Sequence, residues 1–333
     1  MTPETPDTII IGGGPAGLQA ALTLGRMRHR VLVLDAGDYR NDPADAMHNL
    51  VGHDGWSPAE YRAAARSDLA AYETVTVREA RAESVAASPD GFVVRLAGGE
   101  QLPAHWLILA TGLRDTLPET PGLAEVFGST AAHCPYCHGF EYADRPVGLL
   151  GTGPHTPRVA LLMHRLTDDL TVLADGAEPA PETAAVLDRI GARVRTEPVL
   201  GVRPAEDGVV VELDGGDPVE VAGLMVAPTY AQAAPFAEQL GLELQDSGCI
   251  RVDPLGRTSL PRVYAAGDLA HTDAFPMPLS SVANAIATGL ATATAVDGDD
   301  IMRQLGLPAV PWTPRPGPRQ PRRPSLRLRG RRG

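Results

Sequence analysis

Residues 8–17 read Thr-Ile-Ile-Ile-Gly-Gly-Gly-Pro-Ala-Gly, an apolar β-rich run that leads directly into a glycine turn. A helical pattern follows through about Arg28, and a second apolar strand, residues 31–34, ends at Asp35. This βαβ order lets a glycine turn and a helix N-terminus approach a pyrophosphate, while the acidic residue binds ribose hydroxyls. We expect a bound dinucleotide, with a purely structural glycine turn as the alternative. The expected contacts are Gly12, Gly14, Pro15, Ala16, Gly17, Asp35 and Ala36.

A second unit of the same kind begins at residues 147–153, Val-Gly-Leu-Leu-Gly-Thr-Gly, and ends near Asp175. Two such units predict an α/β fold with two Rossmann-like, three-layer ββα nucleotide-binding domains. The strand-like run 263–268 ends in Ala-Gly-Asp ahead of a helical stretch, residues 280–296, and should return to the first domain. We therefore expect a discontinuous first domain, residues 1–116 and 245–311, with residues 117–244 inserted after a proline-rich hinge.

Residues 133–138 read His-Cys-Pro-Tyr-Cys-His. Two intervening residues hold the sulfurs of Cys134 and Cys137 within bonding range, which favours a redox pair over a zinc site, because no second C-x-x-C exists to complete four ligands. We predict no bound metal. An imidazole with a pKa near neutrality suits proton transfer during thiol–disulfide exchange, so His138 and His133 are candidate acid–base residues.

Composition limits the partners that the protein can have. The chain carries 41 acidic and 29 basic residues, and eight of the Arg lie in the last segment, residues 312–333, which has no acidic residue. An acidic body repels nucleic-acid phosphates, and a Pro/Arg/Gly-rich segment of this kind is typically a disordered basic tail. No apolar run is long enough for a membrane span, and the first residues lack a signal-peptide pattern. We expect a cytoplasmic protein with neither nucleic acid nor membrane as partner.

These residues together resemble the low-molecular-weight thioredoxin reductase family across residues 8–300. The resemblance implies that FAD is the dinucleotide, that Cys137 faces the flavin, and that Cys134 faces the substrate. It also places His138 where those reductases carry an acidic proton donor, and it implies a homodimer. The further FAD contacts expected from the resemblance and from the glycine-rich loop near residue 49 are Asn49, Ala110, Thr111, Gly112, Gly267, Asp268, Ser281 and Val282.

The second glycine segment departs from that family. The loop 151–157 contains Pro154 and Pro157, which remove N–H donors at a helix start, and the following strand ends in acidic Asp175 where an NADPH 2′-phosphate would need cations. We expect this domain to be vestigial for nicotinamide, with a divergent NAD(P)H site as the alternative.

The Cys-Pro-Tyr-Cys-His-Gly motif with a degenerate second site resembles one branch, the dithiol oxidases that close disulfides in gliotoxin, holomycin and romidepsin-type natural products. The holomycin-pathway enzyme is the most similar of these. That resemblance implies a small-molecule, dithiolopyrrolone-type dithiol substrate, with electrons passing through the cysteines and FAD to O2 and yielding H2O2. The alternative is an NAD(P)H-dependent thioredoxin or disulfide reductase.

Overall fold

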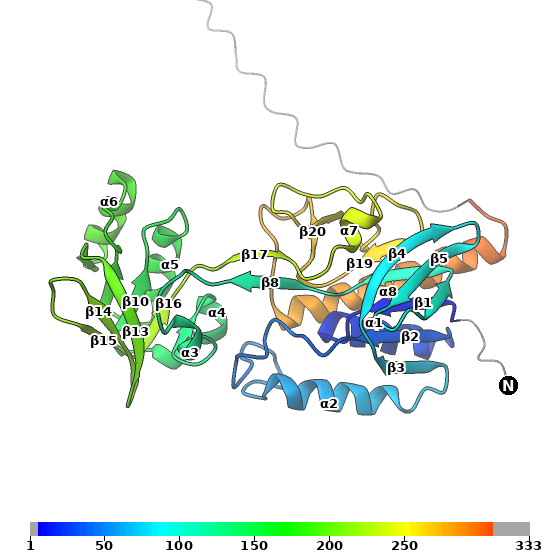
Figure 1. Cartoon of the computed structure of the whole chain (residues 1–333), viewed down its shortest axis with the longest axis horizontal. Helices are drawn as coiled ribbons and strands as arrows, with labels where there is room; N and C mark the ends of the chain where they lie inside the picture. Colours follow the sequence, from blue (N-terminus) through cyan, green and yellow to red (C-terminus); the bar gives the residue numbers. More distant parts are fainter. Residues whose placement is uncertain (1–5, 309–333) are drawn as a thin grey trace, which may run out of the picture.

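The computed structural model describes residues 6–308. Two lobes lie side by side and are joined by a narrow two-stranded ribbon (Figure 1). The expected basic tail, residues 312–333, lies outside the described residues.

The first lobe is built on a five-stranded parallel sheet of order β19-β7-β1-β2-β3. Strand β1 pairs with β2 on one side and β7 on the other, so the glycine turn that follows β1 leaves from the middle of the sheet. The strands are β1 (Thr8–Ile11), β2 (Val31–Asp35), β3 (Val75–Glu79), β7 (Trp106–Leu109) and β19 (Val263–Ala265). Since β19 pairs with β7, the chain returns to this lobe late in the sequence, as the sequence indicated.

Alternation along β1 explains the layers of the first lobe. Ile9 and Ile11 pack with Phe92 on one face of the sheet, while Ile10 packs with Leu24 on the other. Successive strand residues point to opposite faces, so an apolar run buries both. One face carries the antiparallel sheet β4 (Ala82–Ser88), β5 (Gly91–Leu96) and β6 (Gln101–Ala104). The other faces helices α1 (Pro15–Arg26), α2 (Pro58–Leu69) and α8 (Val282–Gln304).

The second lobe repeats this plan on a parallel sheet of order β12-β11-β10-β16-β9. Leu150 packs with the antiparallel strands on one face, and Leu149 packs with the helical side on the other. Its parallel strands are β9 (Ala131–Ala132), β10 (Val147–Leu150), β11 (Leu170–Leu173), β12 (Arg193–Arg195) and β16 (Gly223–Met225). Its antiparallel strands are β13 (Val199–Ala205), β14 (Gly208–Leu213) and β15 (Val219–Val221). The predicted pair of three-layer Rossmann-like units is therefore confirmed.

The ribbon between the lobes consists of β8 (Leu113–Thr116) and β17 (Thr229–Gln232), which are antiparallel. After β17 the chain packs back into the first lobe, where Phe236, Ala237 and Leu242 join the core around Ile9. We therefore propose that the inserted domain ends at β17 rather than at residue 244. Short elements complete the structure: α3 (Leu123–Val126), α4 (Pro135–His138), α5 (Thr156–Met163), α6 (Pro181–Arg189), α7 (Phe236–Gln239), β18 (Ile250–Val252), β20 (Ala270–Thr272) and a 3-10 turn (Phe140–Tyr142).

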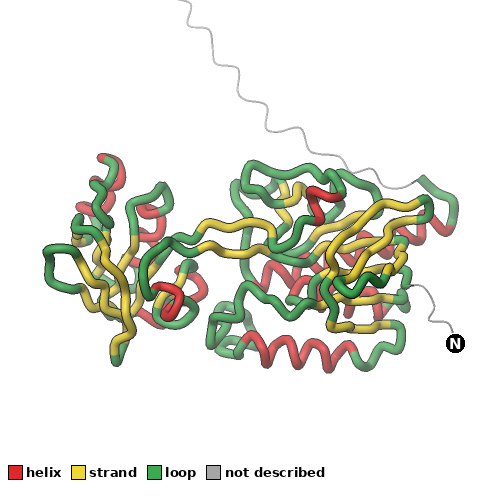
Figure 2. Tube along the Cα trace, in the orientation of Figure 1, coloured by secondary structure: helices red, strands yellow, loops and turns green. Residues whose placement is uncertain are grey.

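The boundaries of two helices differ from the expected ones. Helix α1 ends at Arg26, because Arg28 adopts a left-handed backbone with φ of 63°. Helix α8 continues to Gln304, past the expected end near Val296. Its extra turns carry Asp299, which accepts hydrogen bonds from Arg257 (2.7 and 2.9 Å) and from the Tyr264 hydroxyl (2.5 Å), and these buried contacts anchor α8 to β19. Figure 1 shows α8 in orange running through the middle of the first lobe, above α2, and Figure 2 shows it in red among the helices of that lobe.

Candidate active site

A cavity of about 620 Å³ lies where the carboxyl ends of the first-lobe strands face the second lobe. Ligands of open parallel sheets bind at this edge, and the volume suits a large organic cofactor. All the expected cofactor and catalytic residues line the cavity except Gly17. The lining set is Gly12, Gly14, Pro15, Ala16, Asp35, Ala36, Asn49, Ala110, Thr111, Gly112, His133, Cys134, Cys137, His138, Gly267, Asp268, Ser281 and Val282.

The turn after β1 is shaped for close approach of a ligand. Gly12 has φ of +118°, and a Cβ there would lie 2.3 Å from the carbonyl oxygen of Ala110. Gly14 caps α1 without a side-chain hydrogen bond, and nothing occupies the space beside it, which leaves helix N–H groups free to meet a phosphate. Gly17 does not line the cavity but lets α1 pack closely against the turn, because a Cβ at that position would lie 1.9 Å from the oxygen of Gly12. These residues fit the pyrophosphate of FAD.

Asp35 ends β2 and is only 3% exposed. Its carboxylate accepts hydrogen bonds from Gly37 N (3.1 Å), from the Tyr39 hydroxyl (2.5 Å) and from Arg66. Burial, followed by the hydrogen bond to Asp35, raises the pKa of Tyr39 to about 12. The predicted ribose contact therefore belongs to a polar cluster in which Tyr39 and Arg66 orient the carboxylate.

Cys134 and Cys137 form a disulfide with a Cα–Cα distance of 5.2 Å. Cys134 caps the single-turn helix α4, and its carbonyl accepts from the N–H of Cys137 and of His138, each at 3.1 Å. Pro135 begins this turn, a position where its missing N–H costs nothing. The turn therefore presents both sulfurs and the following imidazole to one cavity.

The two imidazoles beside the disulfide have lowered pKa values. Burial is the main cause for His138, and it outweighs the neighbouring Glu141 carboxylate, which pulls the pKa upward. Desolvation by surrounding protein also lowers the pKa of His133, and repulsion from the Arg40 guanidinium adds to it, although the side chain remains open to the cavity. Both rings are therefore largely neutral near pH 7, the form that accepts a proton from a thiol.

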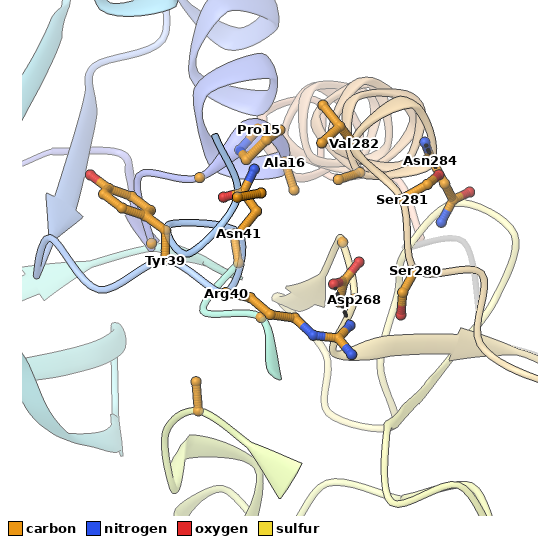
Figure 3. Close-up of a pocket in the computed structure, with 18 of the residues that line it drawn as sticks. Pro15, Ala16, Tyr39, Arg40, Asn41, Asp268, Ser280, Ser281, Val282 and Asn284 are labelled. Carbon is orange, nitrogen blue, oxygen red and sulfur yellow. Dashed lines mark hydrogen bonds and ion pairs between the residues drawn. The ribbon is translucent and has the colours of Figure 1, made fainter. Parts of the chain in front are cut away.

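Arg40 connects the first lobe to the ribbon. Its guanidinium donates to Asp115 on β8 (2.7 and 2.9 Å) and to Asp268 after β19 (2.8 Å). Figure 3 shows the side chain crossing the cavity floor toward Asp268. Burial opposes the charge of Arg40, but the two carboxylates outweigh it and raise its pKa. The predicted cofactor contact Asp268 thus has its carboxylate engaged by an arginine that sequence reasoning missed.

The N-terminus of α8 borders the cavity as expected. The Ser281 hydroxyl accepts from Asn284 N (3.1 Å), and the Asn284 amide donates to Leu279 O (2.7 Å), so the first turn is capped by its own side chains. Figure 3 shows Ser281, Val282 and Pro15 converging from α8 and α1. The positive end of the α8 dipole therefore lies at the cavity, where it favours a negative charge on a bound group.

The second glycine turn differs from the first in the side chains that surround it. Thr156 stands at the position that the third glycine, Gly17, has in the first turn. Its hydroxyl donates to Gly151 O (3.1 Å), whereas Gly17 allows the backbones to come into contact. The imidazole of His155 lies against Gly153, since a Cβ there would meet the ring at 2.8 Å. Asp175 adopts φ of 52° and its carboxylate accepts from Val199 N (2.7 Å). Pro154 matches Pro15 of the first turn, but Pro157, the His155 imidazole and the Asp175 carboxylate are additional here, where a nicotinamide dinucleotide would need amides and cations.

Comparison with known proteins identifies the family. The family model described as pyridine nucleotide-disulphide oxidoreductase matches residues 6–289. The chain belongs to this family. It is 32% identical over 314 residues to thioredoxin reductase sirT of Leptosphaeria maculans, covering 89% of this chain and 94% of that one. It is 36% identical over 285 residues to thioredoxin reductase tcpT of Claviceps purpurea, covering 80% and 87%.

Among solved structures, that of HlmI superposes with a TM-score of 0.83 at 32% identity, covering 92% of this chain and 96% of the other. The expected resemblance to thioredoxin-reductase-like flavoproteins is confirmed, so this family member is an oxidoreductase and its cofactor is FAD. No group of three or more metal-binding side chains lies within residues 6–308, and no helix in that range is long and apolar enough to cross a membrane.

Sequence reasoning missed several cavity residues. Tyr39, Arg40, His48 and Arg158 all line the cavity but stand in no recognised motif. Arg158 from α5 donates to the Met277 sulfur at 3.6 Å, which brings residues 119 positions apart together. The proximity of Tyr39, Arg40 and His48 to the end of β2 was the one available signal, because loops at that edge of a parallel sheet hold ligands.

Proposed function

We propose that this protein is an FAD-dependent dithiol oxidase, which closes an intramolecular disulfide in a small dithiol of the dithiolopyrrolone type and uses O2 as acceptor. One observation carries the proposal. The Cys134–Cys137 disulfide lines the same cavity as the first glycine turn, whereas at the second turn His155 lies against Gly153 and Thr156 bonds back to Gly151 O. The likeness to HlmI supports the substrate class. We further propose a cytoplasmic homodimer.

The residues at the disulfide suit an exchange reaction. A neutral His138, assisted by His133, takes the proton from a substrate thiol, and the thiolate attacks Cys134 Sγ. The Cys134–Cys137 bond breaks as the new bond forms, and Cys137 leaves as the thiolate. The second substrate thiolate then attacks the substrate sulfur of the mixed disulfide, which releases the cyclic disulfide and leaves Cys134 reduced. Bound FAD would supply the two-electron acceptor that returns Cys134 and Cys137 to the disulfide, with O2 as the final acceptor, which together with the two protons lost by the dithiol would give H2O2.

The first glycine turn and the α8 N-terminus hold the cofactor in this proposal. Gly12, Gly14 and Gly17 let the α1 amides reach the pyrophosphate, and Ser281 and Val282 direct a positive helix end at the cavity. Arg40 fixes Asp268 and Asp115 and thereby positions the β19 turn against the ribbon. Cys137 would face the flavin and Cys134 the substrate.

Steady-state oxygen uptake tests the proposal. With dithiothreitol as substrate and no nicotinamide, we expect one H2O2 for each disulfide formed. The Cys134→Ser variant should form neither the disulfide nor H2O2 above the slow uncatalysed oxidation of dithiols, for which it is the control. Oxygen uptake equal to that of buffer alone would reject the proposal.

A second candidate is an NAD(P)H-dependent disulfide reductase. The retained unit β10–α5–β11 and the names of the relatives sirT and tcpT favour it. Disulfide reduction that consumes NADPH or NADH stoichiometrically would establish this function instead.

A further inference from the structure

His48 brings a third imidazole to the cavity. It lies in the loop after β2, lines the cavity and is 22% exposed. Its ring meets that of His138 edge-on, with centroids 6.3 Å apart. The two rings come from different lobes, since His138 ends α4. The assembled site thus pairs the imidazole beside the disulfide with one from the cofactor-binding lobe.

His138 has an unused nitrogen. Its Nδ1 is buried and has no hydrogen-bond partner among the described residues, although the ring also borders the cavity. A buried imidazole nitrogen needs a donor or acceptor, and leaving it unpaired is unfavourable. The orphaned nitrogen therefore marks a place where a proton can leave His138.

Beyond His48 the polar groups continue toward solvent. Its Nδ1 lies 3.4 Å from Glu141 Oε1 and 3.8 Å from Asp54 Oδ2. The Asp54 side chain is 65% exposed, so protons that reach it exchange with bulk water. The charged and titratable groups that act on the two rings are Glu141, Asp54 and His133. An ordered series thus runs from the disulfide through two imidazoles to exposed carboxylates.

We propose that His48 is a positioning and proton-relay residue, which takes the substrate-derived proton from His138 and hands it to Glu141, Asp54 and solvent. The proposal rests on the dithiol oxidase function. Each substrate dithiol loses two protons as its two sulfurs join, while the electron pair goes to the enzyme disulfide. His138 accepts a proton from a substrate S–H, and His48 accepts it in turn, so His138 is neutral again before the second thiol reacts. No additional oxidant or reductant is involved.

The electrostatics agree with this direction of transfer. Burial lowers the pKa of His138, the charge of Glu141 raises it, and His48 lowers it further. Burial disfavours the charged form of His138, so a proton taken from a thiol is readily passed on.

Rapid-quench analysis of the mixed disulfide at Cys134 tests the relay, because His48 acts after His138 has taken the first proton and before the second thiol reacts. The holoenzyme is mixed anaerobically with dithiothreitol, quenched with an alkylating reagent and analysed by mass spectrometry for the cysteine peptide. In His48→Gln, which keeps polarity but not proton transfer, we expect resolution of the mixed disulfide by the second substrate thiol to slow by roughly tenfold or more, with a changed pH profile and FAD content unchanged. Glu141→Gln should slow it less. The matched control is His53→Gln, a histidine in the same loop that packs on Trp56 and should leave the rate unchanged.

A titration of the ¹³C-labelled imidazoles gives a readout besides activity. We expect the pKa of His138 to rise in His48→Gln and to fall in Glu141→Gln, because those neighbours act with opposite signs. Wild-type quench rates and pH profiles in both His48→Gln and Glu141→Gln would overturn the relay. Failure of the dithiol oxidase function itself is distinguishable, since wild-type enzyme would then consume no oxygen with dithiols, whatever the relative quench rates.

Discussion

The two glycine turns of this protein follow similar strands but differ in the residues that could contact a phosphate. After β1, Gly17 lets helix α1 approach the turn to backbone contact, and Gly14 leaves the helix amides open to the cavity. After β10, Thr156 bonds across the turn, His155 packs onto Gly153, and Pro157 removes an amide at the start of α5. The same Rossmann topology thus carries two different turns, so dinucleotide binding has to be argued from the turn itself.

The largest expected effect concerns the cysteines, which link the first turn to substrate. Cys134→Ser and Cys137→Ser should each lower turnover by on the order of a thousandfold or more, because no disulfide remains to exchange. FAD should stay bound in both. Only Cys134→Ser should show a long-wavelength thiolate–flavin absorbance, since it leaves Cys137 free. A band in Cys137→Ser instead would reverse the assignment of the two sulfurs.

The turns themselves can be compared by exchanging their third residues. Gly17→Thr places a Cβ on the Gly12 oxygen, so the purified variant should lose most of its FAD, as measured by flavin absorbance against protein. Thr156→Gly removes only a local hydrogen bond and should retain full FAD content. Equal FAD content in both variants would show that the first turn does not hold the cofactor.

Arg40 offers a test of how the first lobe holds the ribbon. Arg40→Met leaves Asp115 and Asp268 without their buried cation, which should lower the free energy of unfolding by about 3–5 kcal/mol. Arg203→Met in the second lobe breaks an exposed pair with Glu212 and should cost less than about 1 kcal/mol. Urea unfolding of both variants measures the difference. Equal losses would mean that the Arg40 network is not structurally important.

A smaller effect is expected in the pH profile. Because the folded pKa of His138 lies below its ordinary value of 6.5, the neutral base persists as pH falls through 6.5, and the rate with dithiol should decline only at lower pH. His138→Ala should remove this acid limb and lower the rate throughout. The check is a pH series of rapid-quench rates in the wild type and the variant, and a limb centred above 6.5 would contradict the assignment.

Much of this arrangement could be predicted from local sequence. The run 8–17 contains both the strand and the three glycines, and the spacing of Cys134 and Cys137 is itself the requirement for a disulfide. The return of residues 263–268 to the first sheet was also predictable, because Ala-Gly-Asp ends an apolar strand before a helix.

Other contacts could not be predicted, because they join distant residues through the fold. Arg40 reaches Asp268 across 228 positions, and His48 meets Glu141 only when the lobes are assembled. Likewise, the contacts of Asp268 with Arg40 and of Asp35 with Arg66 depend on how the elements pack, and the spacing of residues in the sequence does not predict them. Sequence therefore identified the groups that need a fixed local geometry, and missed those whose partners come from another element.

The most direct test of the central claim is the anaerobic absorbance of the flavin as NADPH, NADH and then dithiothreitol are added. The dithiol oxidase account predicts no bleaching by either nicotinamide, bleaching by the dithiol alone, and recovery in air with H2O2 formed. Rapid bleaching by NADPH or NADH would contradict it and show that the second turn still binds a nicotinamide.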